Sequence, residues 1–310
     1  MSPIHRLGRE VKFSDLWMGT TYDHVGNRLS STNTTTEWGY DDNNELIGYN
    51  DVSLSYDLNG SLIVKTQNWE ITTFENTIEN QIKSVHFNSA DMDVSYYYDP
   101  FGRRLYEENI RIKKYFFYTN EGMVGEYDND GKEVKSYVWK TANAWSTDPL
   151  LIKNEQNYYI YQNDSLGTPH VMTTENGTIV WSAKYDSFGN AILETETVNN
   201  DIRFPGQFYD DILKLNYNYN RYYNSFTGSY LQKDKMYSGS ELNLYVYARN
   251  NPLRFMDPFG LNSSSGKGHL IFRCVVQIHK ETNKGLHYLG ETGLIGHCFV
   301  LLDEAATRQK

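Results

Sequence analysis

The chain has 310 residues, of which 39% are apolar and 22% charged, and its formal net charge is −10 at pH 7. This length suffices for one large all-β domain or two ordinary domains with a sizeable core. No apolar run is long enough to form a membrane-spanning helix, and segment 1–17 lacks the apolar stretch of a signal peptide. The negative charge argues against general nucleic-acid binding by the whole molecule.

The apolar content is dominated by aromatic residues, since the chain contains 26 Tyr, 14 Phe and 6 Trp. A tyrosine ring can be packed on one side and hydrated on the other. Aromatic residues are also enriched in β-strands. This composition therefore favours strands with large half-buried surfaces.

A Tyr-Asp pair followed by a turn recurs along the chain. In most copies a glycine follows the aspartate by three residues, and in several a leucine comes shortly after the glycine. The copies begin at Tyr22, Tyr40, Tyr56, Tyr98, Tyr127 and Tyr185. A recurrence at intervals near twenty residues is typical of a β-strand repeat.

Each copy has a direct physical interpretation. The tyrosine ends a strand, the aspartate accepts a backbone N–H in the turn, the glycine supplies a positive φ, and the leucine begins the next strand. Between the copies, segments 94–98 and 115–118 have strand character, and no long segment has a helical period. The sequence predicts an all-β fold. An unrelated β-sandwich with Asp-Gly turns is the alternative, which the shared residue order disfavours.

The second half of the chain carries a series of more specific motifs. They are Asp-Ser-Leu-Gly-Thr-Pro at 164–169, Trp-Ser-Ala-Lys-Tyr-Asp-Ser-Phe-Gly at 181–189, Gly-Gln-Phe-Tyr-Asp at 206–210, Asn-Arg-Tyr-Tyr at 220–223, Thr-Gly at 227–228, Leu-Asn-Leu-Tyr-Val-Tyr-Ala-Arg-Asn-Asn-Pro at 242–252 and Asp-Pro-Phe-Gly-Leu at 257–261. With the Tyr-Asp copies, these motifs resemble the RHS or YD-repeat proteins, over about residues 20–261. The later motifs resemble the RHS-associated core that ends such proteins.

The resemblance implies a fold and an organisation in three segments. Segment 1–157 is expected to be a YD-repeat β-strip that winds into a partial RHS shell, and segment 158–261 the core, a plug at the C-terminal end. Segment 262–310 is expected to be a linker and a short variable effector. Its composition supports the last boundary, because it holds both cysteines, four of the eight histidines and six Lys/Arg against four Asp/Glu.

Similar proteins include bacterial polymorphic toxins, C components of insecticidal toxin complexes, wall-associated proteins and, more distantly, teneurins. The resemblance implies that the chain is the C-terminal part of a longer RHS protein, or an orphan cassette. The implied partners are its own C-terminal segment as encapsulated cargo, a missing N-terminal strip or a partner shell subunit, and an immunity protein. The implied location is outside a bacterial cell, secreted or on its surface. No cofactor and no metal are predicted.

Peptide self-cleavage by carboxylates requires two of them close together, so that one holds a proton while the other activates water. By resemblance to the core pattern, Asp234 and Asp257 are the candidates, and the bond between Leu261 and Asn262 is the one expected to break. Arg221, in the Arg-Tyr-Tyr motif, is suited to hold one carboxylate ionised. In the alternative interpretation, Asp257 merely begins a turn and Asp234 is a solvated loop acid.

Two departures from the core pattern bear on this site. Lys235 stands where a proline is usual after the first aspartate, and Asn224 stands where the motif usually continues with aspartate. A lysine beside Asp234 is expected to depress the pKa of that carboxyl and to weaken its ability to share a proton.

The tail offers several chemical interpretations. Cys274 or Cys298 with His297 or His269 would provide a thiol nucleophile and a base. A zinc site from Cys274, His279, His297 and Cys298 has poor spacing, because adjacent residues on one strand point to opposite faces. The small positive charge would suit a nuclease. The alternative is that both cysteines are buried in a two-stranded core.

Two functional hypotheses follow. In the first, the chain is part of an RHS-repeat toxin whose core cuts itself after Leu261 and releases the C-terminal effector. In the second, it is a non-catalytic surface or wall-associated protein whose exposed tyrosine-rich strands serve adhesion or carbohydrate binding. Only the first requires the Leu261 bond to be cut and Asp234 to be present.

Overall fold

The computed structural model of the chain describes residues 20–261, apart from 32–33, 35 and 237–241, together with the backbone of five short strands outside that range. The described residues form strands and a single 3-10 helix, η1 (Ala248–Asn250), which confirms the all-β prediction. Within this part of the chain no helix is long and apolar enough to cross a membrane.

The strands, in chain order, are β1 (Lys12–Phe13), β2 (Leu16–Trp17), β3 (Thr21–Tyr22), β4 (Arg28–Ser30), β5 (Gly39–Tyr40), β6 (Leu46–Tyr49), β7 (Val52–Tyr56), β8 (Leu62–Gln67), β9 (Glu70–Asn76), β10 (Ile82–Phe87), β11 (Met92–Tyr98), β12 (Arg104–Asn109), β13 (Lys113–Tyr118), β14 (Met123–Tyr127), β15 (Glu133–Trp139), β16 (Pro149–Asn154), β17 (Asn157–Asn163), β18 (Pro169–Thr173), β19 (Ile179–Tyr185), β20 (Ala191–Glu196), β21 (Phe208–Asp210), β22 (Leu215–Asn218), β23 (Arg221–Asn224), β24 (Ser229–Tyr230), β25 (Phe255–Met256), β26 (Ser264–Ser265), β27 (Ile271–Arg273) and β28 (Phe299–Leu301).

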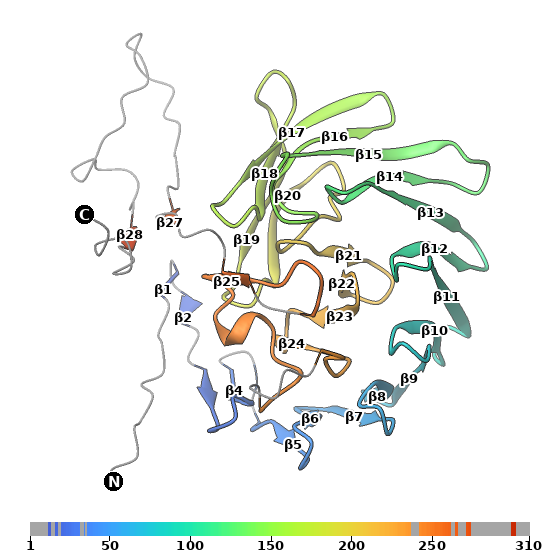
Figure 1. The fold of residues 1–310 in the computed structure, drawn as a ribbon, viewed down its shortest axis with the longest axis vertical. Coiled ribbons are helices and arrows are strands. Elements are labelled where there is room, and N and C mark those ends of the chain that lie inside the picture. The colour runs from blue at the N-terminus through green and yellow to red at the C-terminus, as the bar shows by residue number, and fades with distance from the viewer. Residues whose placement is uncertain are drawn as a thin grey trace.

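One long sheet dominates the fold. Strands β5 to β20 form a 16-stranded antiparallel sheet in which every strand pairs with its neighbours in sequence. Figure 1 shows that this sheet is curved and that β21 to β24 lie on its concave side. We call residues 39–196 the strip and residues 199–261 the inner segment. The strip is the architecture expected of a YD-repeat shell.

Five of the six Tyr-Asp copies form turns of the strip, as predicted, and the copy at Tyr22 forms the turn between β3 and β4 outside it. All six of their tyrosines end a strand. In the turn at Asp99, for example, Oδ1 accepts hydrogen bonds of 2.9 Å from the amides of Phe101 and Arg103. Gly102 has a φ of +80°, and Asn44, which holds the equivalent place after Asp41, has a φ of +65°. The sequence pattern thus specifies both the end of each strand and the direction of the chain after it.

The inner segment packs against the strip through aromatic side chains. Its own four-stranded sheet has the order β21-β22-β23-β24. Phe116 of the strip meets Phe208 edge to face, with 5.6 Å between the ring centroids, and Tyr96 meets Tyr222 at 5.9 Å. Both pairs belong to one buried core that runs through the strip and the inner segment. Burying one such ring contributes roughly 1.5–3 kcal/mol.

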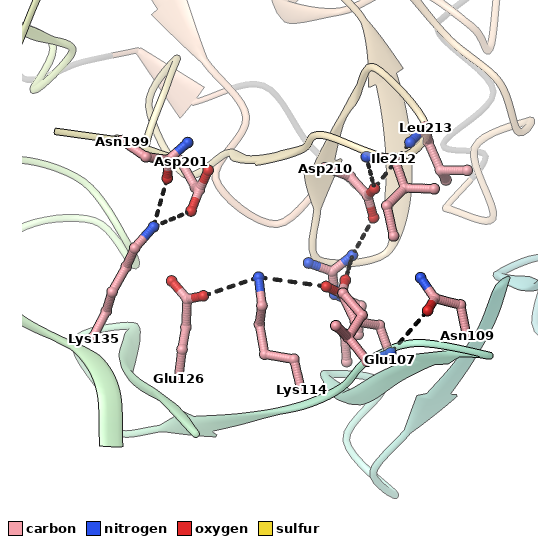
Figure 2. Close-up of polar contacts among 12 residues, drawn as sticks. Glu107, Asn109, Lys114, Glu126, Lys135, Asn199, Asp201, Asp210, Ile212 and Leu213 are labelled. Atoms are coloured by element: carbon pink, nitrogen blue, oxygen red, sulfur yellow. Dashed lines mark hydrogen bonds and ion pairs between the residues drawn. The ribbon is translucent and has the colours of Figure 1, made fainter. Parts of the chain in front are cut away.

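A row of buried charges also joins the two parts (Figure 2). Arg104 Nη1 lies 2.7 Å from Asp210 Oδ2 and 3.4 Å from Glu107 Oε2. Lys114 lies between Glu107 and Glu126, at 3.5 and 3.2 Å. Farther along the strip, Lys135 binds Asp201 and Asn199 of the inner segment. Because a buried charge without a partner is costly, these pairs fix the position of the inner segment on the strip.

The predicted segment boundaries can be placed on these elements. The division at 157/158 lies at the start of β17, within the 16-stranded sheet. Beyond residue 261, β27 pairs antiparallel with β28, with Ile271 opposite Leu301. The assignment of separate roles to segments 1–157, 158–261 and 262–310 stays a prediction.

Candidate functional site

The candidate site is centred on Arg221, the first residue of β23. This side chain is buried, with 2% of its surface exposed. Its Nε donates a hydrogen bond of 2.6 Å to the carbonyl of Gly260, and its Nη1 donates one of 3.0 Å to the carbonyl of Leu244. The guanidinium also lies 3.6 Å from the centre of the Tyr230 ring. These contacts leave Nη2 directed at the carboxylates described next.

The two predicted aspartates meet at one nitrogen of this arginine. Arg221 Nη2 lies 2.8 Å from Asp234 Oδ2 and 3.4 Å from Asp257 Oδ2. The side chains of both aspartates are less than a tenth exposed. The alternative that Asp234 is a solvated loop acid is therefore wrong. The resemblance to the RHS core pointed to these three residues, and the fold brings all of them together.

Asp257 has further hydrogen-bond donors around it. Tyr230 donates its hydroxyl to Oδ2 at 2.9 Å, and the amide of Leu261 donates to Oδ1 at 3.0 Å. Asn218 Nδ2 donates to both the Tyr230 hydroxyl and the Asp257 carbonyl, at 2.8 Å each. Sequence reasoning missed Tyr230 and Asn218. No pattern distinguished them from the other tyrosines and asparagines of the strands.

The turn at residues 257–261 is held by hydrogen bonds to its backbone carbonyls. Asn220 Nδ2 donates a hydrogen bond of 3.0 Å to the carbonyl of Phe259, in addition to the contact between Arg221 and the Gly260 carbonyl. Gly260 has a φ of +64°, and a Cβ there would lie 2.5 Å from the Asn218 carbonyl oxygen. Only glycine fits this position without a shift of the backbone. The residues that precede the Leu261–Asn262 bond are thus held beside Arg221, whose Nη2 contacts both carboxylates.

The pKa of Asp234 is raised above its ordinary value. Burial is the largest cause, because it disfavours the charged carboxylate, and the nearby Asp257 acts in the same direction. Arg221 opposes the shift, as do the Met236 amide and, least of all, Lys235. Lys235 thus lowers the pKa of Asp234 as expected, but burial outweighs the charge of that lysine and the pKa is raised overall. Burial lowers the pKa of Lys235 itself.

The other departure from the core pattern, Asn224, lies at the end of β23. Its Oδ1 accepts hydrogen bonds from the amides of Phe226, at 3.0 Å, and Thr227, at 3.4 Å. These contacts cap the turn between β23 and β24. An asparagine oxygen accepts from backbone amides as an aspartate oxygen does, so this turn does not require an aspartate.

The remaining predicted residues lie outside the described residues; they are Asn262, His269, Cys274, His279, His297 and Cys298. Within residues 20–261, as far as they are described, no group of three or more His, Cys, Asp or Glu side chains is arranged to hold a metal ion.

Comparison with known proteins agrees with this architecture. Residues 12–253 match the family model described as Teneurin YD-shell. The chain is 25% identical over 281 residues to the double-stranded DNA deaminase toxin A of Burkholderia cenocepacia, covering 80% of this chain and 19% of that protein. It is 28% identical over 273 residues to the tRNA nuclease WapA of Bacillus subtilis, covering 83% of this chain and 11% of that protein.

A shorter sequence match and a structural superposition agree with these relatives. Toxin protein Tse5 of Pseudomonas aeruginosa is 35% identical over 107 residues, which cover 34% of this chain and 8% of Tse5. The Tc holotoxin pore of Photorhabdus luminescens superposes with a TM-score of 0.51 at 16% identity, over 82% of this chain and 17% of that one. At this identity the superposition concerns the fold alone. The chain spans about a fifth or less of the length of these proteins.

The family match covers the strip and most of the inner segment, and the Tyr-Asp turns, the long antiparallel sheet and the superposed shell agree with it. The chain belongs to the Teneurin YD-shell family and is an RHS/YD-repeat protein.

Proposed function

We propose that this chain is part of a toxin shell and that its core cuts the peptide bond between Leu261 and Asn262. The observation that carries the proposal is the contact of Arg221 Nη2 with both Asp234 and Asp257, next to the turn that ends at Leu261. The names of the relatives, a deaminase toxin and a tRNA nuclease among them, support the toxin class.

In this proposal the two aspartates have different roles. Asp234, whose pKa is raised by burial, holds the proton. Asp257, whose Oδ2 accepts from Tyr230 and faces Arg221, acts as the base. Two carboxylates with unequal surroundings at one cation are the arrangement that separates an acid from a base.

The reaction is a hydrolysis. Asp257 takes a proton from a water molecule, whose oxygen attacks the carbonyl carbon of Leu261, while Asp234 donates its proton to the carbonyl oxygen. The carbon–nitrogen bond then breaks as Asp257 passes the proton it took from water to the nitrogen of Asn262, and Asp234 takes back its proton from the hydroxyl on the carbon of Leu261. The products are a carboxylate on Leu261 and an amine on Asn262, and water is the only other reactant. General acid–base catalysis of this kind contributes about 10²–10⁴-fold.

Cleavage would separate the shell from segment 262–310, the proposed effector. That segment would be the encapsulated cargo, the strip would be completed by further YD-repeat strands or a partner subunit, and an immunity protein would protect the producing cell. We propose that the assembly acts outside the producing bacterium, as a secreted or surface toxin.

The direct test is the intact mass of the full chain, purified at neutral pH, beside Asp234→Asn. We expect two fragments that divide after Leu261 in the wild type and a single intact mass in the variant. The chain contains its own control for acid scission, because Asp99-Pro100 and Asp148-Pro149 are Asp-Pro bonds like Asp257-Pro258. An uncut wild type, or cutting in both chains, would refute the proposal.

A second candidate function, adhesion or carbohydrate binding, is supported by the outer face of the strip. Tyr97, Tyr106, Tyr115 and Tyr127 stand opposite one another on β11 to β14. The first two rings stack at 4.2 Å, and Tyr97 is 44% exposed. Binding of the chain to polysaccharide beads, lost in Tyr97→Ser/Tyr106→Ser, would support this function. Equal retention of the wild type and the variant on the beads would exclude this row of tyrosines as the carbohydrate-binding surface.

A further inference from the structure

Asp234 belongs to a short stretch of the inner segment that is bound along a turn of the strip. The turn connects β7 to β8 at residues 57–62, and we call it the Gly60 turn. The amide of Leu62 donates to the carbonyl of Leu231 at 3.1 Å, and the amide of Lys233 donates to the carbonyl of Gly60 at 3.0 Å. Ser61 and Gln232 form an antiparallel bridge between these two hydrogen bonds. The backbone is thus held up to the residue immediately before Asp234.

Asp234 also binds the chain segment that contains Leu244 and Tyr245. Its amide donates to the carbonyl of Leu244 at 3.1 Å, and Arg221 Nη1 donates to the same carbonyl at 3.0 Å. The next residue, Tyr245, donates its hydroxyl to the Gly60 carbonyl at 2.8 Å. The Gly60 carbonyl therefore binds both chain segments that determine where the Asp234 carboxylate lies relative to Arg221.

The approach at Gly60 leaves no room for a side chain. A Cβ at this position would lie 2.4 Å from the Tyr245 hydroxyl and 3.0 Å from the Cβ of Lys233. Gly131 holds the equivalent place in the turn between β14 and β15, with a φ of +75° against +78° at Gly60, and a Cβ there meets nothing within 4 Å. The two glycines therefore adopt the same backbone conformation and differ in what they touch.

We propose that the Gly60 turn is a positioning element of the cleavage site, so that the aspartate pair is complete only after the inner segment has docked on the strip. The inference rests on the proposed function. Cleavage then takes place only in chains whose inner segment has docked, because Gly60, about 170 positions earlier in the chain, determines the position of the Asp234 carboxyl. A misplacement of about 1 Å is enough to slow a positioned reaction by about 10²-fold.

The test compares the full-length wild type with Gly60→Ala and Gly131→Ala. Each chain is made by cell-free translation, and the fragment that ends at Leu261 is followed over time by mass spectrometry. Urea midpoints are measured in an Asp257→Asn background, where all chains stay uncut. We expect both variants to lose stability, since both place alanine at positive φ, and Gly60→Ala to lose more, because its Cβ also meets the Tyr245 hydroxyl and Lys233. We expect Gly60→Ala to slow cleavage at least tenfold and Gly131→Ala to stay within twofold of the wild type.

A second pair of variants covers the case that Gly60→Ala does not fold. Tyr245→Phe removes the hydroxyl that binds the Gly60 carbonyl and adds no atoms, and Tyr98→Phe removes a hydroxyl that binds the Ile82 carbonyl at 2.7 Å elsewhere on the strip. Slower cleavage in Tyr245→Phe alone supports the inference. Equal rates in the wild type and in both Gly60 and Tyr245 variants would overturn it. An uncut wild type would refute the proposed function, and the inference with it.

Discussion

Asp99 and Asp257 open turns of the same sequence, Asp-Pro-Phe-Gly, but their Oδ2 atoms have different partners. In both turns Oδ1 accepts the amide of the residue four positions later, at 2.9 and 3.0 Å. Asp99 Oδ2 pairs with the partly exposed Arg103 of its own turn, whereas Asp257 Oδ2 contacts the buried Arg221 and the Tyr230 hydroxyl. The candidate site is therefore a repeat turn to which a distant arginine and a second carboxylate have been added.

This difference predicts opposite results for two matched variants. Asp257→Asn keeps an oxygen that can cap the turn but loses the base, so we expect cleavage to fall by about 10²-fold or more. Asp99→Asn loses only a partly exposed ion pair, which contributes about 0–1 kcal/mol, and should cleave as the wild type does. Intact mass measures the first effect and urea denaturation the second. Equal cleavage in Asp257→Asn and the wild type would exclude Asp257 as the base.

Tyr230→Phe should slow cleavage about tenfold. The variant removes the hydroxyl that donates to Asp257 Oδ2, and a hydrogen bond to a charged group contributes about 1.5–3 kcal/mol. The time course of the fragment ending at Leu261 measures this rate.

The control for this variant is Tyr223→Phe. Tyr223 is also buried, and its hydroxyl donates to the Phe188 carbonyl at 2.7 Å. Its loss should lower stability by about 1–3 kcal/mol, because a buried carbonyl loses its donor, and should leave the rate of cleavage unchanged. Equal slowing of cleavage in both variants would show that the effect of Tyr230 is structural.

Much of the strip could be predicted from the sequence, because its determinants are local. The tyrosine, aspartate and glycine of each Tyr-Asp copy act within one turn, and their order along the chain is enough to place the ends of strands such as β7 and β11. The aspartate pair was also found, through a resemblance that supplied the spacing between Asp234 and Asp257.

What could not be predicted depends on contacts between distant residues. Arg104, Glu107 and Lys114 carry charges, which usually face solvent, yet they belong to the buried row that meets Asp210 of the inner segment. The docking of Gly60 beside Lys233 joins residues far apart in the chain. Such contacts follow from how the sheet curves, which no local pattern encodes.

Arg104→Met should lower the free energy of unfolding by about 3–5 kcal/mol. The variant keeps an unbranched side chain but leaves Asp210 and Glu107 buried without the cation between them. Lys83→Met is the matched control, because the pair of Lys83 with Glu75 is exposed and contributes about 0–1 kcal/mol. Urea denaturation of both variants in the uncut Asp257→Asn background measures the difference. Equal losses would mean that the buried row does not anchor the inner segment.

The raised pKa of Asp234 predicts how the stability of the uncut protein depends on pH. A carboxyl whose pKa is higher in the folded than in the unfolded state stabilises the fold in its protonated form. That contribution is fully present below the unfolded value, 3.8 for aspartate, and is lost as pH rises through the folded value. In the Asp257→Asn background, Asp234 should therefore lose stability relative to Asp234→Asn as pH rises through this window. If stability instead rises with pH relative to Asp234→Asn, the charge of Arg221 affects the pKa of Asp234 more than burial does.

The same shift predicts that cleavage slows as the pH rises. If Asp234 must hold a proton to donate it to the Leu261 carbonyl, the active fraction falls as pH passes the raised pKa of Asp234. Chains translated in vitro and diluted into buffers between about pH 5 and pH 8 should cleave fastest at the acidic end. Lys235→Pro removes the lysine charge, which lowers the pKa of Asp234 less than Arg221 and the Met236 amide do. The pH at which the rate falls should therefore rise only slightly. A rate that rises through this range would reverse the two roles and make Asp234 the base.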